Sequence, residues 1–132
     1  MREEFNKKYD FLKSSVSQGL VWCFWHTLLW VVDSEFNDWK AIPYVISNIV
    51  VITSITVLMN IFMEWYNNLL YSVLLHFGFN IIYVFLDADI GFFVILTVLY
   101  LIITPIAVLI RNERMKQFFK NDDREKGKLL GR

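Results

Sequence analysis

Residues 90–110 read IGFFVILTVLYLIITPIAVLI, an apolar stretch close to the ~20 residues that cross a bilayer as an α-helix. Three further apolar segments precede it, at about residues 16–32, 42–63 and 69–86. Backbone N–H and C=O groups in lipid must be satisfied internally, which favours helices over open strands. The sequence therefore predicts an all-α fold, an integral membrane bundle of four transmembrane helices that forms a single membrane domain over residues 1–132.

The composition agrees with a membrane protein and argues against nucleic-acid binding. Hydrophobic residues make up 56% of the 132-residue chain, which is more than a soluble domain of this size can bury. Basic and acidic residues number 13 each, so no excess of positive charge is available for a nucleic acid. The single cysteine, Cys23, cannot form an intrachain disulfide and is expected to be a small buried apolar residue. The lipid bilayer is therefore the expected partner.

Charge placement predicts how the bundle is oriented. Basic residues lie before the first segment and after the last, and they are Arg2, Lys7, Lys8, Lys13, Arg111, Arg114, Lys116, Lys120, Arg124, Lys126, Lys128 and Arg132. Since basic flanks stay inside, both termini are expected to be cytoplasmic in a multi-pass protein of the plasma (inner) membrane. The basic tail at residues 111–132 is expected to lie along the anionic inner leaflet. The short connections predict that sequential helices pack as antiparallel neighbours.

Polar side chains within the apolar segments indicate which helix faces point into the bundle, because such groups are costly in lipid. In the third segment they follow spacings of three and four residues and share one helical face, formed by Ser72, His76, Asn80, Tyr83 and Asp87. A second stripe, predicted to serve helix packing, is formed by Thr53, Thr56, Asn60 and Glu64. Asp87 and Asp89 are expected to be cap and interface residues.

His26 and His76 are predicted to lie at similar depth. The first and third helices run in the same direction, and at ~1.5 Å per residue their imidazoles differ in height by about one turn, with Asn80 level with His26. We therefore expect two imidazoles and a carboxamide to converge on one buried pocket. Histidine and asparagine can also join transmembrane helices by hydrogen bonds alone, and that alternative stays open.

Two motifs carry a resemblance to a known family. The stretch KKYDFLKSSVSQGLVWCFWHTLLW, at residues 7–30, contains an aromatic-x-x-x-His pattern from Trp22 to His26. HFGFN, from His76 to Asn80, has the pattern His-x-x-x-Asn, and WYNN occupies residues 65–68. Over about residues 7–86 the chain resembles the CPBP family, the CAAX-prenyl-protease and bacteriocin-processing (Abi) membrane proteins.

The resemblance implies an intramembrane endopeptidase acting on a membrane-bound peptide or protein, in CAAX-type or in leader- or bacteriocin-related processing. It implies His26, His76 and Asn80 as catalytic residues. His26 would help a glutamate activate the attacking water, and His76 and Asn80 would stabilise the oxyanion that forms on the scissile carbonyl. Hydrogen bonds to developing charge are strong in a low-dielectric pocket, and histidine can carry protons near neutral pH.

The family's Glu-Glu-x-x-x-Arg motif is not found where the resemblance places it. Glu3 and Glu4, followed by Lys8, imitate the motif out of register and are not expected to be the catalytic pair. The chain is therefore expected to be the C-terminal part of such a protease, with little hydrolysis unless a partner chain supplies the glutamates. A non-enzymatic bacteriocin self-immunity membrane protein is the rival hypothesis, since lost glutamates would fit that role.

No cofactor is expected. A catalytic zinc normally takes three protein ligands and keeps an open position. His26 and His76 supply two ligands, and Asn80 is a poor zinc ligand. A zinc site would therefore need a carboxylate from elsewhere.

Overall fold

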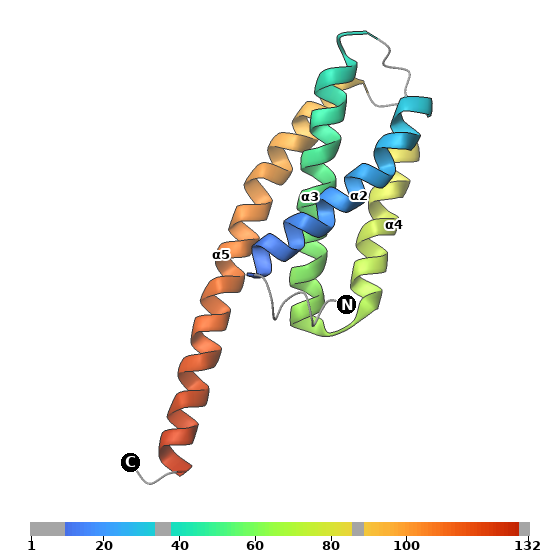
Figure 1. Ribbon diagram of the computed structural model, residues 1–132. Helices are drawn as coiled ribbons and strands as arrows, with labels where there is room; N and C mark the ends of the chain where they lie inside the picture. The colour runs from blue at the N-terminus through green and yellow to red at the C-terminus, as the bar shows by residue number, and fades with distance from the viewer. Residues whose placement is uncertain (1–9, 34–37, 86–88, 130–132) are drawn as a thin grey trace.

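The computed structural model describes residues 10–33, 38–85 and 89–129, and over these ranges the regular structure is α-helical (Figure 1). The helices are α2 (Phe11–Asp33), α3 (Ala41–Tyr66), α4 (Leu69–Phe85) and α5 (Ile90–Leu129). Each overlaps one predicted apolar segment, which confirms the all-α fold. Among the described residues, Ala41–Tyr66 and Ile90–Phe118 are long and apolar enough to cross a membrane, and Leu69–Ile81 is a shorter apolar helix.

Helix α3 is the centre of the bundle. Ser54, Ile55, Thr56 and Val57 are buried one after another. Successive side chains of a helix point about 100° apart, so four consecutive buried positions mean that α3 is covered on every side. The covering elements are α2, α4 and α5, each of which packs against α3. In Figure 1, α4 and α5 flank α3 on opposite sides and α2 crosses it obliquely.

The predicted packing of sequential helices is correct for two connections and wrong for the third. Helices α2 and α3 pack together, as do α3 and α4, but the described parts of α4 and α5 do not approach each other closely. Helix α5 lies against α3 because contacts at both ends of α3 hold it there. Phe93 packs edge-to-face on Tyr44, with ring centroids 5.0 Å apart. At the other end, Arg111 pairs with Glu64.

Helices α2 and α3 meet at small residues. A Cβ atom at Gly19 would lie 2.8 Å from the Cα atom of Thr53, so the two backbones are in contact there. One turn further along α2, Cys23 is 4% exposed and its thiol donates to the Ile49 carbonyl at 3.6 Å. The prediction that Cys23 is a small buried residue is confirmed.

The second polar stripe serves helix packing, as predicted. Asn60 Nδ2 donates to Ser15 Oγ and to Gln18 Oε1, each at 3.1 Å, which joins α3 to α2. Thr56 donates its hydroxyl to the Ile52 carbonyl within α3. These polar groups are therefore satisfied inside the bundle.

Arg111 and Glu64 form a clamp that connects three helices. Arg111 Nε lies 2.6 Å from Glu64 Oε2, and Nη2 lies 2.9 Å from Oε1, a bidentate pair between α5 and α3. The Arg111 guanidinium also stacks over the Phe11 ring of α2, 3.9 Å from its centroid. Arg111, the first residue of the basic segment at 111–132, therefore packs against the bundle.

Replacing Arg111 by glutamine is expected to lower the free energy of unfolding by about 2 kcal/mol, because Glu64 keeps its charge without a partner. The effect stays below that of a fully buried pair, since the two side chains are 15% and 29% exposed. Lys116→Gln is the matched control, because Lys116 pairs with Glu113 on the exposed part of the same helix. Thermal unfolding of the detergent-solubilised protein measures both, and equal losses in the two variants would contradict the clamp.

Short side chains set the helix ends that position the site. Asn67 adopts the left-handed conformation with φ 45°, and its N–H bonds to the Met63 carbonyl at 3.0 Å, which closes α3. Asn68 Oδ1 then accepts the Leu70 N–H at 2.9 Å as α4 begins. Asp89 caps α5, where its Oδ1 accepts the Phe92 N–H, as predicted. Asp87 lies outside the described residues.

Helix α5 does not end at residue 110. It continues to Leu129 and projects away from the bundle (Figure 1). The charged segment after residue 110 contains no proline, and Lys116 and Glu113 pair one turn apart at 2.7 Å, which favours a continuing helix. The helix therefore extends beyond the apolar run that ends at residue 110, without a break at Arg111. That this basic segment lies along the inner leaflet stays a prediction.

Candidate functional site

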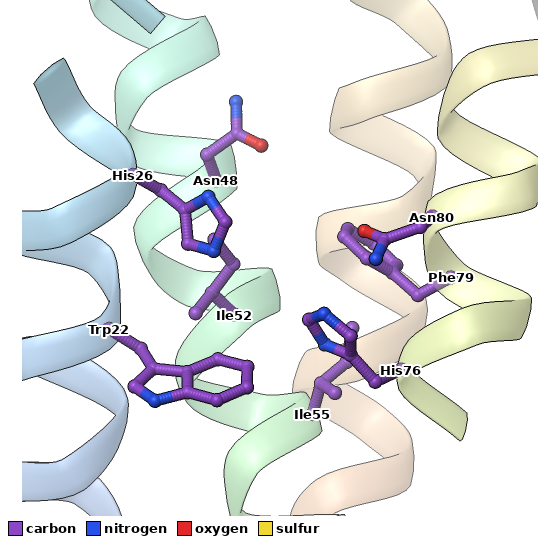
Figure 2. A pocket seen from close by; sticks show the side chains of 8 residues that line it. All are labelled: Trp22, His26, Asn48, Ile52, Ile55, His76, Phe79 and Asn80. Atoms are coloured by element: carbon purple, nitrogen blue, oxygen red, sulfur yellow. The ribbon is translucent and has the colours of Figure 1, made fainter. Parts of the chain in front are cut away.

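A cavity of about 100 Å³ opens where α2, α3 and α4 face one another. It is lined by Trp22, His26, Asn48, Ile52, Ile55, His76, Phe79 and Asn80. Figure 2 shows the α2 and α4 side chains reaching toward each other across the α3 residues. The three predicted site residues, His26, His76 and Asn80, therefore line one cavity.

Helix geometry brings each pair of side chains to the cavity. Trp22 and His26 are one turn apart on α2, and His76 and Asn80 are one turn apart on α4, so each pair shares a helix face. The turn at Asn67 and Asn68 starts α4 directly after α3 and so determines where His76 falls. The close approach at Gly19 holds the α2 pair against α3.

Trp22 contacts both imidazoles. Its ring centroid is 5.0 Å from that of His76 and 6.3 Å from that of His26, in edge-to-face arrangements. Helices α2 and α4 thus meet through side-chain rings, not through backbone contact. The indole ring therefore packs against both histidine side chains.

The pocket is more open than predicted. His26 and His76 are half-buried and Asn80 is exposed. A larger hollow of about 440 Å³ adjoins the cavity and is lined by Val21, Trp22, Trp25, His26 and His76. The described contact between α2 and α4 is through rings, and the side between these helices stays open. A ligand can reach both imidazoles from this side, along the exposed apolar surfaces of Val21 and Trp25.

The motifs on these helices agree with the comparison to known families. Residues 1–82, more than half of the chain, match the family model described as type II CAAX prenyl endopeptidase Rce1-like. The chain belongs to this family. The match contains both motifs, Trp22–His26 and His76–Asn80, and therefore confirms the resemblance to the CPBP family. Neither a curated protein nor a solved structure matches the chain.

Rce1-like proteins are membrane-embedded, which agrees with the two long apolar helices. The matched region includes α2, α3 and most of α4, the helices that line the cavity. Helix α5 lies beyond the match and does not contribute to the cavity lining. The family relationship is thus concentrated in the part of the chain that builds the candidate site.

Sequence reasoning missed Asn48. This residue of α3 is 2% exposed and lines the cavity. It lies four residues before Ile52 and seven before Ile55, so the three share the α3 face that closes the cavity. The stripe from Thr53 to Glu64 lies on another face of α3 and does not include Asn48. The signal available in the sequence was spacing. A polar residue lies four and seven residues before two apolar residues of the same helix face.

The described lining contains imidazoles and carboxamides but no carboxylate. Glu64, in the described part of α3, is held by Arg111 and does not line the cavity. The structure does not describe the side chains of Asp33 and Tyr83 or residues Glu3, Glu4 and Asp87. The described residues therefore do not place a carboxylate general base in the cavity.

The described donors do not fit a zinc ion by themselves. No group of three histidine, cysteine, aspartate or glutamate side chains among the described residues is arranged to hold a metal. Cys23 lies near His26 in sequence, but its thiol faces Ile49 and Thr53 and it does not line the cavity. A zinc ion would need a third ligand from outside this set.

Proposed function

We propose that the cavity is the reacting site of an Rce1-like intramembrane endopeptidase. The observation that carries the proposal is that two motifs on separate helices, Trp22–His26 and His76–Asn80, line one cavity beside an open apolar hollow. A peptide segment entering between α2 and α4 would bring its carbonyl to both imidazoles. We propose a membrane-bound peptide or protein as the substrate, of the CAAX or leader-peptide kind, because the entrance is apolar.

The proposed chemistry is hydrolysis by an activated water. His26 and a carboxylate take a proton from the water as its oxygen attacks the scissile carbonyl carbon. His76 and Asn80 donate hydrogen bonds to the oxyanion that forms. The C–N bond then breaks, and the leaving nitrogen receives the proton. Zinc is not required by this scheme, in which protein groups perform each step.

We propose that the carboxylate comes from outside the described lining, from a partner chain. A binding protein such as a bacteriocin self-immunity factor is the second candidate. The observation that favours it is a described lining with hydrogen-bonding groups and no carboxylate, which can hold a peptide without cleaving it.

The test is cleavage of a farnesylated CAAX peptide by the full chain in lipid vesicles, followed by mass spectrometry. The chain alone is expected to show little hydrolysis, and a co-inserted Glu-Glu-x-x-x-Arg segment is expected to start it, because the base is then present. The same segment with both glutamates replaced by glutamine is the control. Equal product with the two segments would contradict the proposed role of the carboxylate. No product with either would favour the binding protein.

We propose that the protein has four spans in the plasma membrane and that both termini lie in the cytoplasm. The basic residues after residue 110 and the apolar character of the four helices support this arrangement. Labelling of cysteines introduced at Asp38 and Glu113, with an impermeant reagent on intact cells, checks it. Labelling at Asp38 and not at Glu113 is the pattern that this orientation requires.

A further inference from the structure

Asn48 presents a hydrogen-bond acceptor to the cavity. Its Nδ2 donates to the Tyr44 carbonyl at 3.0 Å, one turn back along α3. Only the amino group of a carboxamide can donate, so the Asn48 oxygen must be the atom that points elsewhere. Figure 2 shows this oxygen turned toward the side of the α4 residues. The internal bond to Tyr44 thus orients the carboxamide with its carbonyl toward the cavity.

Asn48 lines the cavity and is 2% exposed, so its side chain has little contact with solvent outside the cavity. The hydrogen bond described for this side chain uses the amino group alone. The oxygen can therefore accept a hydrogen bond from an N–H group of a ligand in the cavity.

The cavity would then offer a hydrogen-bond partner to both the C=O and the N–H of a peptide group. His76 and Asn80 lie on α4 and can donate to a carbonyl oxygen, whereas Asn48 lies on α3 and offers an acceptor. A peptide group carries its C=O and N–H in one rigid plane, pointing in opposite directions. An ester has the same carbonyl but lacks the N–H.

We infer that Asn48 is a substrate-binding residue, which accepts the N–H of the scissile amide and makes the cavity selective for amides over esters. The inference rests on the proposed function of the same cavity, to which it adds a specificity determinant. Sites built to bond a donor reject analogues that lack it, because the buried acceptor is then left unpaired.

A purely structural role for Asn48 is the competing explanation, and α3 offers a matched control for it. Thr56 is also buried, at 5% exposure, and its hydroxyl makes the same kind of bond to the Ile52 carbonyl one turn back. Thr56 does not line the cavity. Thr56→Val therefore removes an equivalent internal bond without touching the proposed site.

The experiment measures binding of two probes to the full chain in lipid nanodiscs. One probe is a fluorescent farnesylated CAAX peptide, and the other is its depsipeptide, in which oxygen replaces the scissile N–H. Wild type and Thr56→Val are expected to bind the amide about 10-fold more tightly than the ester. Asn48→Leu is expected to bring this ratio close to one. A ratio that stays at the wild-type value in Asn48→Leu would overturn the inference, as would a wild-type protein that does not discriminate.

A second variant guards against misfolding. Asn48→Thr removes the carboxamide oxygen but keeps a hydroxyl that can bond to the Tyr44 carbonyl, as Thr56 does with Ile52. The amide-to-ester ratio is expected to fall in Asn48→Thr as it does in Asn48→Leu. An unchanged ratio in a folded Asn48→Thr would count against the inference in the same way.

His76→Ala separates this inference from the proposed function. If His76→Ala weakens binding of both probes while Asn48→Thr leaves their ratio unchanged, the cavity binds peptide and only the role of Asn48 is wrong. If His76→Ala and the Asn48 variants all bind like wild type, the cavity is not the peptide site. The proposed function and the inference then fail together.

Discussion

His76→Ala and Asn80→Leu are each expected to lower the rate of peptide cleavage about 100-fold when a partner segment supplies the proposed carboxylate. Removing one preorganised donor from an oxyanion site typically costs two to three orders of magnitude in rate, because the interaction strengthens as negative charge develops. Both residues line the cavity from one face of α4. The loss is expected mainly in kcat and not in KM, since the bond matters most in the transition state.

Leu75→Ala provides the control for this experiment. Leu75 directly precedes His76 on α4, is 38% exposed, and does not line the cavity. Its variant is expected to cleave at nearly the wild-type rate. Rates are compared in the same vesicles with the co-inserted Glu-Glu-x-x-x-Arg segment. Wild-type cleavage by both His76→Ala and Asn80→Leu would show that these donors are not part of the reacting site.

Gly19→Ala is expected to lower the free energy of unfolding by about 3 kcal/mol, at the upper end of the cost of overpacking. The added Cβ would lie 2.8 Å from the Thr53 Cα atom, and a backbone atom cannot move aside as a flexible side chain can. Helix α2 must therefore separate from α3. Since Trp22 and His26 travel with α2, the variant is also expected to cleave about 10-fold more slowly.

Gly78→Ala is the matched control for this substitution. Gly78 lies on α4 within the His76–Asn80 motif, and a Cβ there would meet nothing within 4 Å. Its unfolding free energy is expected to stay the same or rise by up to about 1 kcal/mol, because alanine favours a helix more than glycine does. Thermal unfolding in detergent measures both variants. Similar stability of the two proteins would mean that α2 and α3 do not meet at Gly19.

The helical bundle and most of the candidate site could be predicted from local patterns. Runs of apolar residues near the length of a membrane span indicated four helices, and α4 and α5 begin at the predicted residues 69 and 90. Spacings of four residues placed Trp22 with His26 and His76 with Asn80 on single helix faces. An apolar run and the helix that contains it need not end at the same residue, however. A helix can continue through polar residues that favour it, and α5 therefore extends beyond the apolar run to Leu129.

The partners of each helix depended on contacts between distant residues. Tyr44 with Phe93, and Glu64 with Arg111, bring α5 onto α3. Glu64 belongs to a periodic polar stripe, but nothing in the sequence pairs it with Arg111 or Tyr44 with Phe93. The same holds for Asn48, which entered the cavity lining only because α3 became the central helix. Opposite charges and aromatic rings have many partners of equal chemistry along the chain, so sequence cannot choose among them.

The sequence by itself determined the helices, their polar faces and the two family motifs, because each follows from short-range spacing along one helix. The tertiary structure alone decided that α3 lies at the centre, that the pocket is open between α2 and α4, and that Asn48 lines it. The physical reason is that packing depends on how side chains of separate helices fill the space between them. The sequence specifies the side chains of each helix but not which of them come into contact.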